Sequence, residues 1–122
     1  MNKEILKKRT TDFAHRCARL CSALPENWLG LHIRSQLIRC STSAAANYRA
    51  ACISQSKASF IAKLGIALEE ADEACFWLEF ITEENLLSEN KCRLLLEEAK
   101  ELTAIFAASQ KTARNRKLKI DN

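Results

Sequence analysis

The sequence is poor in the residues that form turns. Its 122 residues include 2 glycines and 1 proline, whereas an average chain of this length holds about nine glycines and about six prolines. β-Sandwiches and β-barrels need a turn about every 8–12 residues, so both are excluded. There is also no glycine cluster that could surround a phosphate group, as the loops of nucleotide-binding folds do. The composition favours one domain of long helices joined by short connections.

The sequence also lacks the features of exported and membrane-spanning proteins. Its first nine residues carry charges where a secretory signal has an apolar segment. No stretch approaches the roughly 18–20 uncharged apolar residues of a membrane span. The six cysteines are widely spaced, form no CxxC motif and lie mostly at apolar helical positions. We therefore expect free, buried thiols in a cytoplasmic protein that has no membrane contact.

Apolar residues recur with alternating spacings of three and four in four segments, which is typical of helices that pack in a bundle. Residues 25–27, 54–56 and 84–88 interrupt the pattern, and Ser54, Ser56 and Ser88 are candidate N-caps. We predict an all-α, antiparallel, up-down-up-down four-helix bundle over residues 1–110. Residues 111–122 form a basic C-terminal tail, which is either an extension of the last helix or a disordered arm. The four series are Leu6, Thr10, Phe13, Cys17, Leu20, Leu24; Ile33, Leu37, Cys40, Ala44, Asn47, Ala51; Phe60, Leu64, Ala67, Ala71, Ala74, Leu78, Ile81; and Cys92, Leu95, Ala99, Leu102, Phe106, Ser109.

Residues for catalysis or metal binding are scarce. A di-iron bundle needs two Glu-x-x-His pairs, but neither His15 nor His32 follows a glutamate by three residues. No nucleophile has a base at a recognisable spacing. The acidic cluster at residues 69–73 is better explained by ion pairs with Arg34, Arg39 and Arg49, within a protomer or between subunits. We predict no enzymatic activity, no metal, no cofactor and no small-molecule substrate.

The third helix carries more apolar surface than one bundle seam requires. Ile61, Ile66, Leu68, Phe76, Trp77 and Phe80 form a second stripe beside the core series. Because aromatic residues dominate the centres of interfaces, we expect a homo-oligomer. The alternative is that these rings cover the ends of a single bundle. Candidate interface residues are Tyr48, Arg49, Phe76, Trp77 and Phe80.

The net charge of +4 is unevenly distributed along the chain. Residues 1–20 and 109–122 each carry +4 and residues 21–55 carry +2, whereas residues 56–87 carry −5 and residues 88–108 carry −1. The basic segments predict either solvated faces of a neutralised bundle or a surface that binds nucleic acid by its phosphates. The candidate contacts are Lys7, Lys8, Arg9, Arg16, Arg19, Arg34, Arg39, Lys111, Arg114, Arg116 and Lys117.

Two sequence blocks resemble a known family. They are residues 38–52 (IRCSTSAAANYRAAC) and residues 69–74 (EEADEA), the latter followed by Trp77-Leu78-Glu79. These blocks resemble a bacterial four-helix-bundle family whose relatives include proteins encoded in intervening sequences of large-subunit rRNA genes and accessory variability determinants of diversity-generating retroelements. The similarity covers roughly residues 12–108. It implies an antiparallel four-helix protomer that assembles into a homopentamer with a basic surface, which in the retroelement members engages a reverse transcriptase and nucleic acid.

The chain departs from many of these relatives at residues 47–51, which read Asn-Tyr-Arg-Ala-Ala instead of Asn-Ile-Ala-Glu-Gly. Only the fold and the oligomerisation are therefore carried over from the resemblance. Our leading hypothesis is a non-enzymatic homo-oligomeric adaptor that binds RNA, DNA or a nucleic-acid-handling partner such as a reverse transcriptase. The alternative is a purely structural protein-interaction module.

Overall fold

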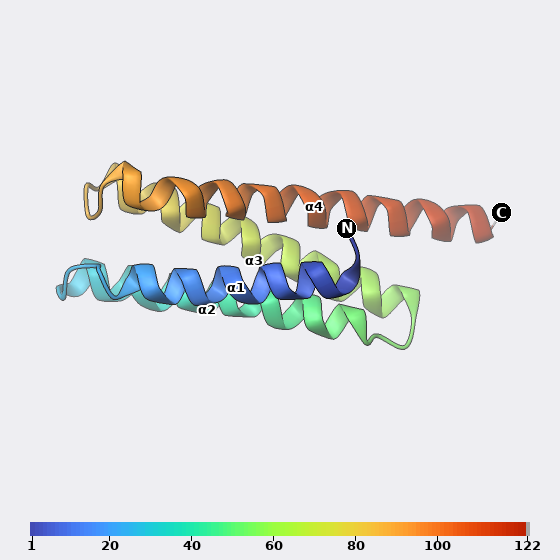
Figure 1. Cartoon of the computed structure of the whole chain (residues 1–122). Helices are drawn as coiled ribbons and strands as arrows, with labels where there is room; N and C mark the ends of the chain where they lie inside the picture. The colour runs from blue at the N-terminus through green and yellow to red at the C-terminus, as the bar shows by residue number, and fades with distance from the viewer. Residues whose placement is uncertain (122) are drawn as a thin grey trace.

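The protein is an all-α four-helix bundle, as predicted (Figure 1). The computed structural model describes the backbone of residues 1–121 and the side chains of residues 1–116. The helices are α1 (Lys3–Cys21), α2 (Trp28–Cys52), α3 (Lys57–Glu83) and α4 (Glu89–Asp121), and no strand occurs in the described residues. No helix among them has the length and apolar character needed to cross a membrane.

Polar side chains fix where the first three helices begin. The side-chain oxygens of Asn2 and Asn27 accept hydrogen bonds from the backbone N–H groups of Ile5 (2.8 Å) and Gly30 (2.9 Å). Ser56, one of the two serines predicted as caps before α3, accepts from the N–H of Ser59 at 3.1 Å. Each cap satisfies a backbone donor that has no partner within the helix. The first three helices therefore begin after asparagine or serine caps.

Two connections depend on special backbone geometry. After α3, Asn85 adopts a positive φ of 57°, and the N–H groups of Asn85 and Leu86 donate to the carbonyls of Thr82 and Ile81, both at 3.0 Å. This is a Schellman termination with asparagine in the place that glycine usually takes. Before α2, a Cβ added to Gly30 would lie 1.9 Å from the carbonyl oxygen of Pro25. Gly30 is therefore needed for the close approach of the α1–α2 connection to α2.

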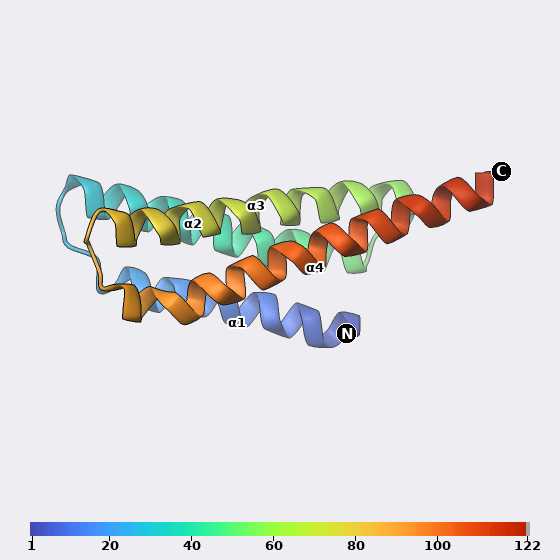
Figure 2. The same cartoon turned by 90° about the horizontal axis from the view of Figure 1, so that it is seen from above.

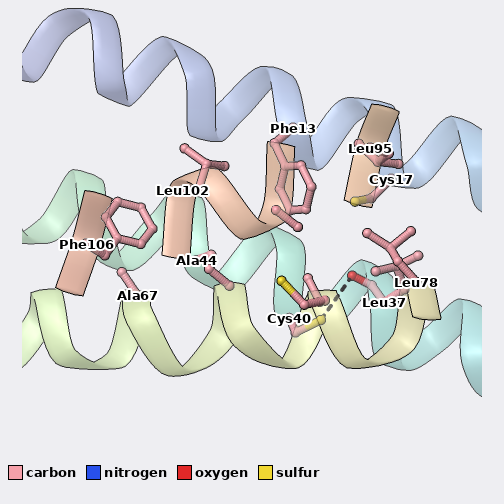
Figure 3. Close-up of a cluster of buried hydrophobic side chains, with 14 of the residues drawn as sticks. Phe13, Cys17, Leu37, Cys40, Ala44, Ala67, Leu78, Leu95, Leu102 and Phe106 are labelled. Atoms are coloured by element: carbon pink, nitrogen blue, oxygen red, sulfur yellow. Dashed lines mark hydrogen bonds between the residues drawn. The ribbon is translucent and has the colours of Figure 1, made fainter. Parts of the chain in front are cut away.

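The core follows most of the predicted series (Figure 3). Leu20, Asn47, Phe60 and Ser109 are only half-buried. All the predicted positions of α3 from Leu64 to Ile81 are buried, and the alanines among them allow α2 and α4 to approach α3 closely. In α2, however, the prediction that Asn47 lies in the core is wrong. Tyr48 is buried instead, at 4% exposed, while the half-buried Asn47 donates to the backbone carbonyl of Ser43 at 2.9 Å.

The helices pack in chain order. α1 packs on α2, α2 on α3 and α3 on α4, whereas α1 and α4 contact each other much less. α4 continues as one helix through residue 121, so the predicted boundary at residue 110 does not coincide with a helix end. Of the two alternatives for the tail, the backbone shows an extension of the last helix. Its final turns project past the α2–α3 connection in both views (Figures 1 and 2).

Candidate nucleic-acid interface

Basic side chains gather at one end of the bundle, where the start of α1, the start of α3 and the final part of α4 meet (Figure 1). We call this region, residues 1–8, 52–63 and 105–116, the basic end. It contains eight lysines and arginines and one acidic residue, Glu4. All eight basic side chains are exposed or half-buried: Lys3, Lys7, Lys8, Lys57, Lys63, Lys111, Arg114 and Arg116.

The opposite end of the bundle has an excess of acidic residues. Residues 17–31 and 76–95 surround the α1–α2 and α3–α4 connections (Figure 1). They contain Arg19, Lys91 and Arg93 against five glutamates, namely Glu26, Glu79, Glu83, Glu84 and Glu89. The uneven charge seen along the sequence therefore becomes an uneven charge along the bundle axis. A polyanion is attracted towards the basic end.

The start of α3 contributes positive charge in two ways. Lys57 directly follows the N-cap Ser56, and the first turn of α3 contains no acidic residue. The unpaired N–H groups of a helix N-terminus carry partial positive charge, so an acidic side chain stabilises this position and a lysine does not. Lys57 therefore lowers the stability of the α3 N-terminus and adds to the positive potential of the basic end.

Lys7 and Lys8, in the first two turns of α1, form ion pairs at the surface of the bundle. Lys7 contacts Glu4 and Lys8 contacts Asp12, both at 2.8 Å. The hydrogen bond from Lys8 holds the pKa of Asp12 below its usual value. Such surface pairs contribute little to stability, because water and salt screen the charges. Lys7 and Lys8 therefore remain available to a phosphate group.

Two predicted contact residues are neutralised inside the protomer. Arg9 binds Glu98 at 2.5 and 3.1 Å and Glu101 at 3.2 Å, which ties α1 to α4. Arg39 binds Glu70 at 2.8 Å and also Glu73, which ties α2 to α3. The predicted pairing of the acidic cluster with α2 is thus confirmed for Arg39. Both guanidinium groups hold the bundle together.

Arg34 also serves the fold. Its guanidinium donates to the backbone carbonyls of Cys21 and Leu24, both at 3.2 Å. Cys21 is the last residue of α1 and Leu24 belongs to the α1–α2 connection, so Arg34 ties α2 to the end of α1 and to this connection. We therefore leave Arg34, like Arg9 and Arg39, out of the candidate interface.

The remaining predicted contacts lie away from the basic end or outside the described side chains. Arg16 and Arg19 lie exposed in the second half of α1, next to Lys91. Arg49 is exposed and lines a shallow hollow between α1 and α2 together with His15. The side chain of Lys117 lies outside the described residues. Lys3, Lys57 and Lys63 were not among the predicted contacts. Lys57 and Lys63 lie in a segment with a net charge of −5.

Phe76, Trp77 and Phe80 of α3 form an aromatic cluster in which Phe76 is exposed and the other two are half-buried. Phe76 is 54% exposed, and its ring centre lies 5.0 Å from that of Trp77 and 5.9 Å from that of Phe80. The indole N–H of Trp77 donates to Glu73 at 3.1 Å. The candidate interface residue Tyr48 is not part of this surface. It is buried in the core and stacks on Phe106 with 5.4 Å between ring centres.

The titratable groups of the described residues do not form a reactive cluster. No group of three His, Cys, Asp or Glu side chains among them could hold a metal ion. All six cysteines are free and five are buried. Burial raises the pKa of Cys21 to about 11 and that of Cys40 to about 12, despite the nearby Arg34 and Arg39. These thiols are protonated at neutral pH and are poor nucleophiles.

Comparison with known proteins agrees with the resemblance seen in the sequence. Residues 2–108 match the model of a family described as 23S rRNA-intervening sequence proteins. The chain belongs to this family. The comparison with curated proteins gave no match.

A solved structure supports the fold of this chain. It is a protein of unknown function from the S23 ribosomal protein family of Bacteroides thetaiotaomicron, which shares 30% sequence identity and superposes with a TM-score of 0.81. The match covers 98% of that chain and 87% of this one. Residues 109–122 lie beyond the family match. We call this segment the α4 extension, and it supplies Lys111, Arg114 and Arg116 of the basic end.

Proposed function

We propose that the protein is a non-enzymatic, homo-oligomeric helical adaptor whose basic end binds nucleic acid through the phosphate backbone. One observation carries the proposal: three helix ends far apart in the sequence bring eight basic side chains together with a single acidic one. The five buried thiols support a role outside catalysis and a reducing compartment such as the cytoplasm. The family description refers to 23S rRNA, so RNA is the first ligand to test. DNA and a reverse transcriptase come next.

The test is the affinity for a fluorescently labelled RNA, measured by anisotropy over a salt series from about 25 to about 300 mM. Binding through phosphates releases counterions, so log K should fall linearly with log salt. The affinity should depend little on base sequence, because the basic end has no recognition helix motif. The proposal fails if the protein does not bind RNA at the lowest salt concentration, or if binding does not depend on salt.

A purely structural interaction module is the second candidate, and the exposed aromatic cluster favours it. Phe76 is too exposed to serve the core of the protomer, and exposed aromatic patches often mark interfaces. We propose that the cluster of Phe76, Trp77 and Phe80 contacts another copy of the chain, in the homopentamer that the family resemblance implies. Both candidate functions include this assembly, and only the first includes RNA binding.

Light scattering tests the assembly. The wild-type protein should have a mass near five times the 13.8 kDa of the chain, and Phe76→Glu should reduce it. Leu94→Glu is the matched control, because Leu94 is similarly exposed (59%) but lies on α4. If the wild-type protein is monomeric, the assembly that both candidate functions include is overturned. If Phe76→Glu and Leu94→Glu both still bind RNA, RNA binding at the basic end does not depend on the aromatic cluster.

A further inference from the structure

An open groove crosses the basic end. It consists of two adjoining hollows of about 430 and 590 Å³, which share Lys3, Phe60, Ala113 and Arg116. Its walls come from the start of α1, the end of α2 with the α2–α3 connection, the start of α3 and the last part of α4. Ligand sites for small molecules typically have volumes of about 300–1,000 Å³. The groove is therefore large enough for a ligand the size of one nucleotide.

The rim of the groove is suited to an anion. Lys3, Lys57 and Arg116 line it, and none of the described residues around either hollow is acidic. Lys57 is also the first residue of α3, where the backbone N–H groups add partial positive charge. Three cationic side chains, with no carboxylate among the lining residues, favour a phosphate group.

The floor of the groove is apolar and aromatic. Tyr48 and Leu6 line one hollow, and the half-buried Phe60 lies between both. The ammonium group of Lys3 lies 5.5 Å from the centre of the Phe60 ring. A phosphate bound to Lys3 would thus bring the rest of its molecule against an aromatic face. Nucleic-acid bases stack on such faces with little dependence on their identity.

We propose that this groove binds a single unpaired nucleotide, with its phosphate at Lys3, Lys57 and Arg116 and its base against Phe60. The nucleotide comes from an unpaired region of a nucleic-acid strand or is a free nucleotide. The inference rests on the proposed binding of nucleic acid at the basic end and adds a preference for unpaired over paired bases. A base within a duplex stacks on its neighbours and cannot reach Phe60. Because Ala113 and Arg116 belong to the α4 extension, the groove depends on a segment outside the family match.

Phe60→Leu tests the stacking. Leucine keeps an apolar side chain at this half-buried position but removes the ring. Anisotropy with a single-stranded oligoribonucleotide should show affinity reduced by about fivefold or more, whereas affinity for a duplex of the same length should stay within about twofold of wild type. Trp28→Leu, the matching loss of an exposed aromatic ring at the opposite end of the bundle, should alter neither affinity. Equal affinities of the wild-type protein for single strand and duplex, or no effect of Phe60→Leu, would overturn the inference.

Cys52 provides a second readout in the unmodified protein. It lines the groove and is the one half-buried cysteine, while the other five are buried. Single-stranded RNA or AMP should slow its reaction with a thiol reagent, and adenosine, which has no phosphate, should not do so at the same concentration. Protection by AMP but not by RNA would identify a free nucleotide as the source. If RNA binding depends on salt but neither RNA nor AMP protects Cys52, the groove site is overturned and the proposed function is not. If the protein does not bind RNA, the proposed function is overturned.

Discussion

The ammonium group of Lys3 lies 5.5 Å from the centre of the Phe60 ring, so the first turn of α1 contacts the first turn of α3 at the basic end. An exposed cation–π contact contributes about 0.5–1 kcal/mol. We therefore expect Lys3→Ala to lower the free energy of unfolding in urea by at most about 1 kcal/mol, while it weakens RNA binding in anisotropy. A loss of several kcal/mol would show that Lys3 is mainly a structural residue.

Phe106 is expected to be among the most important residues for stability. It is fully buried and stacks on Tyr48. Removing a buried phenylalanine side chain costs about 3–5 kcal/mol because a cavity remains, so Phe106→Ala should strongly lower the urea midpoint. Leu94→Ala is the control at an exposed position (59%) and should change the free energy of unfolding by about 0.5 kcal/mol or less. Similar losses in the two variants would contradict the assigned core.

The two glycines should respond to alanine in opposite directions. At Gly30 a Cβ would meet the carbonyl oxygen of Pro25 at 1.9 Å, so Gly30→Ala must displace the α1–α2 connection and lower the melting temperature. At Gly65 the nearest atom is the side-chain nitrogen of Gln110 at 2.7 Å, which can rotate away. Gly65→Ala should therefore gain up to about 1 kcal/mol of helix stability. Thermal unfolding monitored by circular dichroism measures both, and a destabilised Gly65→Ala would show that Gln110 cannot move.

Glu73 should make the stability depend on pH. Burial opposes its ionisation, but the hydrogen bonds from Arg39 and Trp77 outweigh this effect and hold the pKa of Glu73 below its usual value. A carboxylate whose pKa is lowered by folding stabilises the protein above the unfolded pKa, and this stabilisation is lost as pH falls through the folded value. The free energy of unfolding of the wild type in urea should therefore decrease as the pH falls from about 5 to about 3. Glu73→Gln should be less stable than the wild type at pH 7 and should lose less stability as the pH falls. If the two proteins lose the same stability, other carboxylates cause the pH dependence.

The bundle could be predicted from the sequence because local and global signals agree. The series from Leu64 to Ile81 places small and large apolar residues at three- and four-residue spacings, and all of these positions are buried. The error at Asn47 has a simple cause. After Ala44, spacings of both three and four residues fit a helix, and the choice of Tyr48 depends on Phe106 of α4, which no local pattern contains.

The candidate interface could be predicted only in part. The charges of α1 and of the final segment were visible in the sequence, but Lys57 lies in a segment with a net charge of −5. Its role depends on the packing of the start of α3 against the start of α1 and the end of α4. The hydrogen bonds of Arg34 could not be predicted for a related reason, because its carbonyl acceptors belong to the preceding connection and the end of α1. Charges counted at helix ends would have identified the basic end more directly.

The most direct test of the basic end compares two triple variants with the same loss of charge. One replaces Lys57, Lys111 and Arg114 by glutamine, and the other replaces Arg16, Arg19 and Lys91, which are exposed in the other half of the bundle. Salt-dependent RNA binding is measured for both. We expect the first variant to flatten the slope of log K against log salt by about two and the second to leave the slope close to that of wild type. Equal changes in the two variants, or a larger change in the second, would contradict the assignment of RNA binding to the basic end.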